Sequence, residues 1–330
     1  MSEAPMSFTL EELERAALLV HSVVPATAQY MWPKLQQRTG CAVWVKHENQ
    51  TPTGAFKVRG GLVYMDRLRR ANSELSGVVT ATRGNHGQSI AFAAARAGIP
   101  ATIYVPYGNS PDQNSAMSHF GATVVEFGKD FDEAKHEAQR AAVERGWHFV
   151  PSFHRDLVIG VACYALELFR AVADLDTVYV GVGMGSGIVG LILVRDLLGL
   201  QTRIVGVSAA NAPATARSFA AGRPVTTATA LTFADGIATR EPNAGAMAII
   251  CSGAARVIEV SEELIAEAMR AYFDDTHQVA EGAGAAPLAA LLCEQARMAG
   301  RKVGVILSGS NIERARYLQV LGGVTPAVNS

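Results

Sequence analysis

The sequence predicts an α/β protein whose parallel sheets are covered by helices on both faces. Apolar runs typical of strands alternate with segments of helical periodicity along most of the chain. Many of these runs are continuously apolar, as expected of strands buried on both faces of a parallel sheet. Glycine-rich and polar motifs follow several of the strands, at the carboxyl ends where such sheets bind ligands.

Length and composition limit the class of protein. The 330 residues suffice for about two domains or one large α/β domain. A hydrophobic fraction of 49% and a charged fraction of 18% indicate a compact protein with a well-buried core. The net charge of −1 gives no electrostatic reason to bind nucleic acid or an anionic membrane. We therefore expect a small-molecule ligand and neither of those partners.

The termini and the cysteines indicate a cytoplasmic protein. The N-terminal stretch MSEAPMSFTLEELERAA is acidic and has neither the basic nor the apolar region of a secretory signal. No apolar run reaches the ~18 residues of a membrane helix. The cysteines are far apart and lack metal-site spacing, so free thiols in a reducing compartment are expected at Cys41, Cys163, Cys251 and Cys293.

The expected elements alternate in order. The first helix, residues 8–20, begins with Thr9 and Glu12, the pattern of a capping box. Further helices are expected at 57–71, 86–97, 110–121, 130–145, 160–173, 187–199, 262–275 and 284–299. Strands are expected at 41–47, 77–81, 101–106, 122–127, 177–182, 203–208, 255–261 and 302–309. No tandem repeat, low-complexity tract or linker separates domains.

The first motif is the stretch from His47 to Gly61, HENQTPTGAFKVRGG. Small and polar residues precede Lys57 at its centre, so the amine is able to reach a buried carbonyl, as a Schiff-base lysine must. A lone lysine at such a junction is more often a solvated side chain. Three downstream motifs decide between these interpretations.

The second motif, Thr80 to Gln88 (TATRGNHGQ), ends one strand and opens a helix. The unpaired amides of a first helical turn suit a carboxylate, although an ordinary helix capped by Asn85 fits as well. The third, Val180 to Gly190 (VGVGMGSGIVG), also joins a strand to a helix and suits a phosphate held by backbone amides. Ser208 stands where a dinucleotide site needs an acidic residue, so a phosphate monoester fits better. A structural glycine turn is the alternative.

The fourth motif, Leu307 to Asn311 (LSGSN), ends the last strand, where the Ser308 hydroxyl is able to face a ring nitrogen or a phosphate. Two smaller stretches, 234–238 (ADGIA) and 281–285 (EGAGA), are explained equally well as turns.

Together, the four motifs resemble the pyridoxal-phosphate enzymes of the serine/threonine dehydratase family, the tryptophan-synthase-β-like fold, over about residues 20 to 315. The resemblance implies two open, twisted parallel-sheet domains with pyridoxal 5'-phosphate in the cleft between them. The large domain is expected at 1–77 and 153–330, and a small mobile domain at 78–152. A homodimer is expected.

The resemblance also implies roles for site residues. Lys57 is the Schiff-base lysine and the catalytic residue, Asn85 lies by the phenolic oxygen of the cofactor, and Ser308 bonds its pyridine nitrogen. The other expected cofactor-binding residues are Phe56, Gly183, Met184, Gly185, Ser186 and Gly187. The loop for the substrate carboxylate contains Thr82, Arg83, Gly84 and His86.

The implied reaction removes water and ammonia from a β-hydroxy-α-amino acid and gives a 2-oxo acid. After release from the cofactor, Lys57 takes the α-proton as a general base, and the cofactor phosphate protonates the leaving hydroxyl. The hydroxyl of Ser308 leaves the pyridine nitrogen largely unprotonated, which favours rapid elimination.

Departures from the family pattern refine these expectations. Racemases of the family have a serine where this chain has Arg83, and arginine is a poor proton shuttle, so racemisation is not the expected main activity. Arg83 either binds a substrate carboxylate, lines a wider pocket or points to solvent. Ser208 and Ala214 replace the acidic residues of the family's divalent-cation site, so no metal is expected there.

Arg83 and the GMGSG loop resemble most the subgroup that acts on bulkier substrates, such as phenylserine dehydratase, beside the threonine and serine enzymes. The short sequence after Asn311 leads us to expect no regulatory extension and a catabolic role. A hydroxyaspartate ammonia-lyase using Arg83 for the second carboxylate and a hydroxyectoine-utilisation lyase are alternatives. The non-enzyme alternative is a sensor of pyridoxal phosphate or an amino acid, against which the intact Lys57, Asn85 and Ser308 argue.

Overall fold

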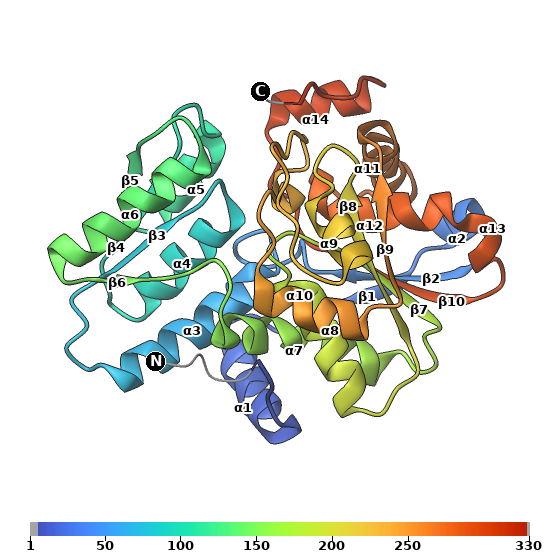
Figure 1. Ribbon diagram of the computed structural model, residues 1–330. Coiled ribbons are helices and arrows are strands. Elements are labelled where there is room, and N and C mark those ends of the chain that lie inside the picture. The colour runs from blue at the N-terminus through green and yellow to red at the C-terminus, as the bar shows by residue number, and fades with distance from the viewer. Residues whose placement is uncertain (1–5, 329–330) are drawn as a thin grey trace.

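The computed structural model describes residues 6–328 and confirms the α/β fold in two sheets (Figure 1). Met1–Pro5 of the N-terminal stretch discussed above lie outside the described residues. The larger sheet has the order β1 (Gln29–Met31), β2 (Ala42–His47), β10 (Lys302–Leu307), β7 (Thr177–Gly181), β8 (Arg203–Ala209) and β9 (Arg256–Val260). The smaller sheet has the order β5 (Thr123–Glu126), β4 (Ala101–Val105), β3 (Val78–Ala81) and β6 (His148–Phe149).

Helices flank both sheets (Figure 1). Those beside the smaller sheet are α4 (Asn85–Arg96), α5 (Pro111–His119) and α6 (Phe131–Arg145). The others are α1 (Leu10–His21), α2 (Pro33–Thr39), α3 (Lys57–Ala71), α7 (Arg155–Ala171), α8 (Ser186–Leu197), α9 (Ala214–Ala221), α10 (Ala244–Gly253), α11 (Glu262–Thr276), α12 (Gly282–Cys293), α13 (Gln295–Met298) and α14 (Arg314–Leu321), with the 3-10 turn η1 (Asp235–Ile237). The capping box of Thr9 and Glu12 is confirmed at the start of α1.

The structure differs from the sequence prediction mainly in short elements. The prediction lacks β1, α2, β6, α9, α10 and α14, several of which are too short to show a period. β1 pairs with β2 in the antiparallel sense, whereas the other neighbouring strands are parallel. The helix expected at 284–299 is two helices, α12 and α13, meeting at Glu294. The smaller sheet lies within residues 78–149; the domain limits at 77/78 and 152/153, and any mobility, stay predictions.

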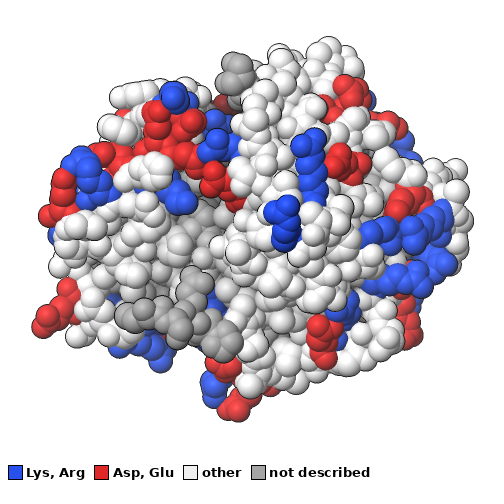
Figure 2. All heavy atoms as spheres, viewed as in Figure 1, with Lys and Arg blue, Asp and Glu red and all other residues white. Residues whose placement is uncertain are grey.

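The surface carries charges of both signs. On the face drawn in Figure 2, basic and acidic side chains are interspersed among uncharged ones. Within residues 6–328, no helix has the length and apolar character needed to cross a membrane.

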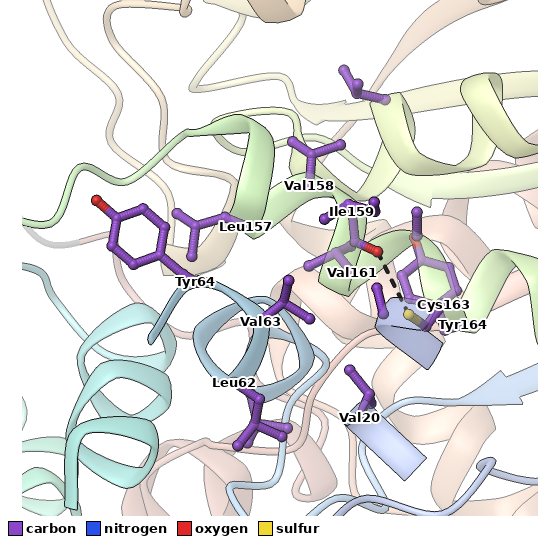
Figure 3. Packing of buried hydrophobic residues seen from close by; sticks show 14 of the residues in the cluster. Val20, Leu62, Val63, Tyr64, Leu157, Val158, Ile159, Val161, Cys163 and Tyr164 are labelled. Carbon is purple, nitrogen blue, oxygen red and sulfur yellow. Dashed lines mark hydrogen bonds between the residues drawn. The ribbon is translucent and has the colours of Figure 1, made fainter. Parts of the chain in front are cut away.

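The backbones of α3 and α7 touch where two glycines meet. A Cβ atom added to Gly160 of α7 would lie 2.4 Å from the carbonyl oxygen of Arg59, and one added to Gly60 of α3 would lie 2.7 Å from that of Leu157. Only glycine permits this approach. Apolar side chains, among them Val63 and Leu157, fill the space beyond the contact (Figure 3). The helix that begins with Lys57 is thus packed tightly against the core.

A buried ion network holds the same end of α3. The guanidinium of Arg59 has no exposed surface and donates from Nε to Glu48 at 2.7 Å and from Nη1 to Glu167 of α7 at 2.6 Å. Lys46 of β2 donates to the second oxygen of Glu167 at 2.6 Å, and Thr27 donates to Glu48 at 2.6 Å. The network ties α3 to β2, α7 and the segment before β1.

Replacing Arg59 with methionine should lower the free energy of unfolding by about 3–5 kcal/mol, because Glu48 and Glu167 lose a buried partner. Urea unfolding followed by far-UV circular dichroism measures this change. Arg140→Met is the matched control, since Arg140 also pairs with two glutamates, Glu137 and Glu144, but on the surface. Equal losses in the two variants would contradict a special role for the buried network.

Candidate active site

A narrow cavity opens at the carboxyl ends of β7 and β10, where α3, α8 and α12 begin. This is the edge at which open α/β sheets bind ligands. Its lining contains every residue expected to bind the cofactor. The full lining is Phe56, Lys57, Asn85, Gly181, Gly183, Met184, Gly185, Ser186, Gly187, Gly236, Ile237, Glu281, Ala283 and Ser308.

Lys57, the first residue of α3, brings its amine to this cavity. The preceding turn is held by the Thr51 hydroxyl, which bonds Ala55, and by the Phe56 amide, which donates to the carbonyl of Ser308 at 3.0 Å. The Lys57 nitrogen lies 4.8 Å from the centre of the Phe56 ring. Burial lowers the pKa of Lys57 to about 8, against the opposing effect of the Glu281 carboxylate. A substantial fraction of the amine is therefore neutral near pH 8 and able to act as a nucleophile or a base.

The glycine loop between β7 and α8 forms a cradle beside the amine. Gly185 has a φ of +100°, which side chains rarely adopt. A Cβ atom on Gly183 would lie 2.3 Å from the carbonyl oxygen of Gly236, so this contact also requires glycine. Ser186 begins α8, whose first amides have no partner within the helix. Glycine at 183, 185 and 187 leaves the loop backbone open enough for its amides to surround an anion such as a phosphate.

Asn85 and Ser308 complete the predicted set. Asn85 begins α4, and its side chain leaves the helix end to donate from Nδ2 to Glu281 at 2.8 Å, so it is not the helix cap. Gly84 occupies the cap position instead. Ser308 follows β10 directly and lines the cavity. Both residues reach the cavity on which Lys57 and the glycine loop converge.

The loop expected to bind the substrate carboxylate lies next to this cavity without lining it. The Thr82 hydroxyl accepts hydrogen bonds from the amides of Gly84 and Gly87 at 3.0 and 3.4 Å, which fixes the loop before α4. The ring of His86 is buried and bonds the Thr80 hydroxyl at 3.1 Å. Burial, together with the charge of Lys57, lowers the pKa of His86 to about 3, so its ring is neutral at pH 7.

Arg83 extends across the cleft between the sheets. Its guanidinium lies 3.8 Å from the carboxylate of Asp235 in η1, and Arg316 of α14 lies 3.7 Å from the same carboxylate. The side chain of Arg83 is 42% exposed, so it lies at the surface while facing Asp235. The role of Arg83 stays a prediction.

Sequence reasoning missed part of the cavity wall. The two stretches explained above as turns, 234–238 and 281–285, both reach it through Gly236, Ile237, Glu281 and Ala283. Their place in the cavity wall is apparent only from the structure, because their small residues suit ordinary turns equally well. Asn311, named only as the end of the fourth motif, donates from Nδ2 to Asn85 at 2.7 Å.

The site at which the sequence predicts no metal lies elsewhere, at the end of β8. Ser208 lies in β8 with a buried hydroxyl that has no hydrogen-bond partner, and Ala214 begins α9. In the described part of the chain, no three His, Cys, Asp or Glu side chains gather as metal ligands. The lack of a metal stays a prediction.

The cavity fits a phosphorylated aldehyde: a lysine with a lowered pKa stands beside a glycine cradle, and a hydroxyl ends the adjacent strand. A model of the family described as "Pyridoxal-phosphate dependent enzyme" matches residues 24–309. The chain belongs to this family. Its cofactor is accordingly pyridoxal 5'-phosphate, and the predicted dehydratase-type enzyme class is confirmed by its relatives.

Three curated relatives are ammonia-lyases. The L-threonine ammonia-lyase of Geobacter sulfurreducens is 37% identical over 278 residues, 84% of this chain and 69% of that protein. The enzyme of the same name from Thermotoga maritima is 34% identical over 306 residues, 92% of this chain and 76% of that protein. The L-threo-3-hydroxyaspartate ammonia-lyase of a Pseudomonas species is 32% identical over 290 residues, 88% of this chain and 91% of that protein. The phenylserine subgroup stays a prediction.

Solved structures agree in fold. Threonine deaminase isoform 2 of Solanum lycopersicum, in its processed form, superposes with a TM-score of 0.87 at 27% identity, covering 98% of this chain and 96% of that one. A pyridoxal 5'-phosphate-dependent aspartate racemase superposes with a TM-score of 0.88 at 28% identity, covering 94% and 97%.

The lowered pKa of Lys57 makes a testable prediction. The rate at which the cofactor-free protein acquires the visible absorption of bound cofactor should rise with pH and level off above about 8, because only the neutral amine attacks the aldehyde. An ordinary lysine, with a pKa of 10.5, would place this midpoint much higher. Lys57→Ala should acquire no such band, and Lys129→Ala, at an exposed lysine, should behave as the unchanged protein. A band in Lys57→Ala would refute the assignment.

Proposed function

We propose that this chain is an ammonia-lyase that removes water and ammonia from a β-hydroxy-α-amino acid and gives a 2-oxo acid. One observation carries the proposal: the Lys57 amine, the glycine cradle, Asn85 and Ser308 all line a single cavity. A sensor would need the cofactor contacts but not a base with a lowered pKa. Release of ammonia from a β-hydroxy amino acid tests the proposal, and bound cofactor without any such release would favour the sensor.

Different residues of the site would serve different parts of the proposed reaction. The bound cofactor supplies an electron-withdrawing ring that acidifies the α-carbon of the substrate. Lys57, once free, takes the α-proton, since its lowered pKa leaves part of the amine neutral near pH 8. The Thr82 hydroxyl accepts from the amides of Gly84 and Gly87 and so fixes the start of α4, and a substrate carboxylate is favoured at such a helix N-terminus. Glycine at 183 and 185 would let the loop backbone approach the phosphate of the bound cofactor.

The charges in the cleft support a substrate with an uncharged side chain, such as threonine, serine or phenylserine. Arg83 and Arg316 face Asp235, and Arg316 also lies 3.6 Å from Glu313. The charges of the two arginines are thus balanced by those of Asp235 and Glu313. No unpaired arginine among these residues is left to bind a second carboxylate of the substrate. Arginine is also a poor proton shuttle, which supports elimination rather than racemisation as the main activity.

Hydroxyaspartate is the second candidate. The distance of 3.8 Å between Arg83 and Asp235 exceeds that of a hydrogen bond, so the guanidinium keeps unused donors. The Pseudomonas hydroxyaspartate ammonia-lyase is also a relative that aligns over most of its length. A dicarboxylate would then displace Asp235 from Arg83.

Substrate preference separates these candidates. We expect ammonia release from threonine, serine or phenylserine to exceed that from threo-3-hydroxyaspartate in kcat/KM, and Arg83→Gln to change the preferred reaction less than about tenfold. Arg316→Gln is the matched control, because it removes the other arginine that faces Asp235. A preference for hydroxyaspartate that falls about 100-fold or more in Arg83→Gln, through the lost charge-assisted bonds, would establish the second candidate instead.

We also propose a homodimer and a small domain at 78–152 that moves as a unit. Exposed apolar side chains on the edge strand β1, Tyr30 at 53% and Met31 at 41%, support a contact with a second copy. The cross-sheet bonds of Asn85 to Glu281 and of Gln113 to the Asn311 carbonyl support a closing motion over the site. The four free cysteines support a reducing compartment.

Tyr30→Glu should shift the protein from dimer to monomer in analytical ultracentrifugation at micromolar concentration, because a buried charge disfavours the contact. Tyr107→Glu, at a tyrosine 64% exposed beside the smaller sheet, is the control and should leave the mass unchanged. A dimer that survives Tyr30→Glu would place the interface elsewhere.

A further inference from the structure

Glu281 has no part in the function proposed above, although it is the only acidic side chain among the described residues that line the cavity. It precedes α12 in the cap position, but its carboxylate makes no capping bond. The side chain instead accepts a hydrogen bond from Nδ2 of Asn85 at 2.8 Å and one from the backbone amide of Asn311 at 3.1 Å. The residue is only 7% exposed, so these two donors replace its contact with water.

The hydrogen bonds fix the orientation of the Asn85 amide. The side-chain nitrogen of Asn311 donates to the carbonyl of Thr53 and to Oδ1 of Asn85, both at 2.7 Å. A backbone carbonyl only accepts, and so does an ionised carboxylate. Asn85 must therefore present its oxygen to Asn311 and its nitrogen to Glu281. One N–H of Asn85 is left for a ligand of the cavity, so the amide offers a donor there.

The carboxylate also acts on the Lys57 nitrogen. The charged groups that act on Glu281 are Lys57 at the start of α3 and Asp235 in η1, while α4 and the loop after β10 present the neutral amides of Asn85 and Asn311. Burial raises the pKa of Glu281 to about 7, with the two amide bonds and Lys57 opposing this shift. Its negative charge in turn favours the protonated form of the Lys57 nitrogen.

We propose that Glu281 is a positioning residue that holds Asn85 as a hydrogen-bond donor to the cofactor and supplies the negative charge that keeps a proton on the Lys57 nitrogen. The inference rests on the family's cofactor and not on the proposed substrate. It explains why a carboxylate is buried at a position where a capping residue with a shorter side chain would serve α12.

The test is a pH titration of the visible absorbance of the cofactor-loaded protein without substrate. In Glu281→Gln the single amide oxygen is able to accept from Asn85, but the Asn311 amide loses its acceptor and the charge is lost. The pH at which the spectrum changes should then fall by about 1–2 units. Glu281→Asp keeps the charge and should restore a midpoint close to that of the unchanged protein. The absence of substrate makes the outcome independent of the proposed reaction.

Glu262→Gln is the matched control. Glu262 is also a buried glutamate at the start of a helix, but its carboxylate accepts from Thr232 and the Phe233 amide, neither of which lines the cavity. Its midpoint should equal that of the unchanged protein. An unshifted midpoint in Glu281→Gln, or the same shift in Glu262→Gln, would overturn the proposal. If Glu281→Gln retains no cofactor, Glu281→Asp decides: an unchanged midpoint supports the proposal, and a fall overturns it.

Discussion

The buried guanidinium of Arg59 is the contact on which the site depends. It lies two residues after Lys57, and its bonds to Glu48 and Glu167 fix the first turn of α3 against the strand before it and the helix beneath it. A buried ion pair of this kind adds little net stability compared with well-packed apolar residues. Its effect is to fix the position of α3, because the Arg59 guanidinium contacts both carboxylates only when the helix lies in one place. The glycine contact between α3 and α7 further restricts this turn.

The cavity is assembled from segments that are far apart in sequence. β7 and β10 lie side by side in parallel, so the glycine loop and Ser308 emerge at the same edge of the sheet. The amide of Phe56 bonds Ser308, which joins the lysine turn to that edge. Asn85 comes from beside the other sheet and reaches the same place through Glu281 and Asn311. The site therefore exists only while the two sheets are apposed.

Because the cavity is assembled from distant segments, only part of it is predictable from the sequence. Lys57, Asn85, the glycine loop and Ser308 each belong to a local motif at a strand end, and local motifs are visible without a structure. Glu281 carries no such signal, because its neighbours are small residues that suit a turn and its partners are 196 and 30 residues away. The long strands and helices follow from periodicity. The three-residue β1 and its antiparallel pairing do not, since they arise from contacts with β2.

The ionisable groups around the cleft form two sets with different surroundings. Lys57 and Glu281 line the cavity, where burial moves both pKa values towards neutrality from opposite sides, to about 8 and about 7. Arg83, Asp235 and Arg316 lie nearer to solvent at distances of 3.7 and 3.8 Å, where water weakens each interaction. The inner set suits the movement of a proton, because either charge state is accessible near neutral pH. The outer set suits discrimination between substrate side chains, because its long contacts are able to exchange for contacts with a substrate. Under the proposed function, proton transfer and specificity would thus belong to different residues.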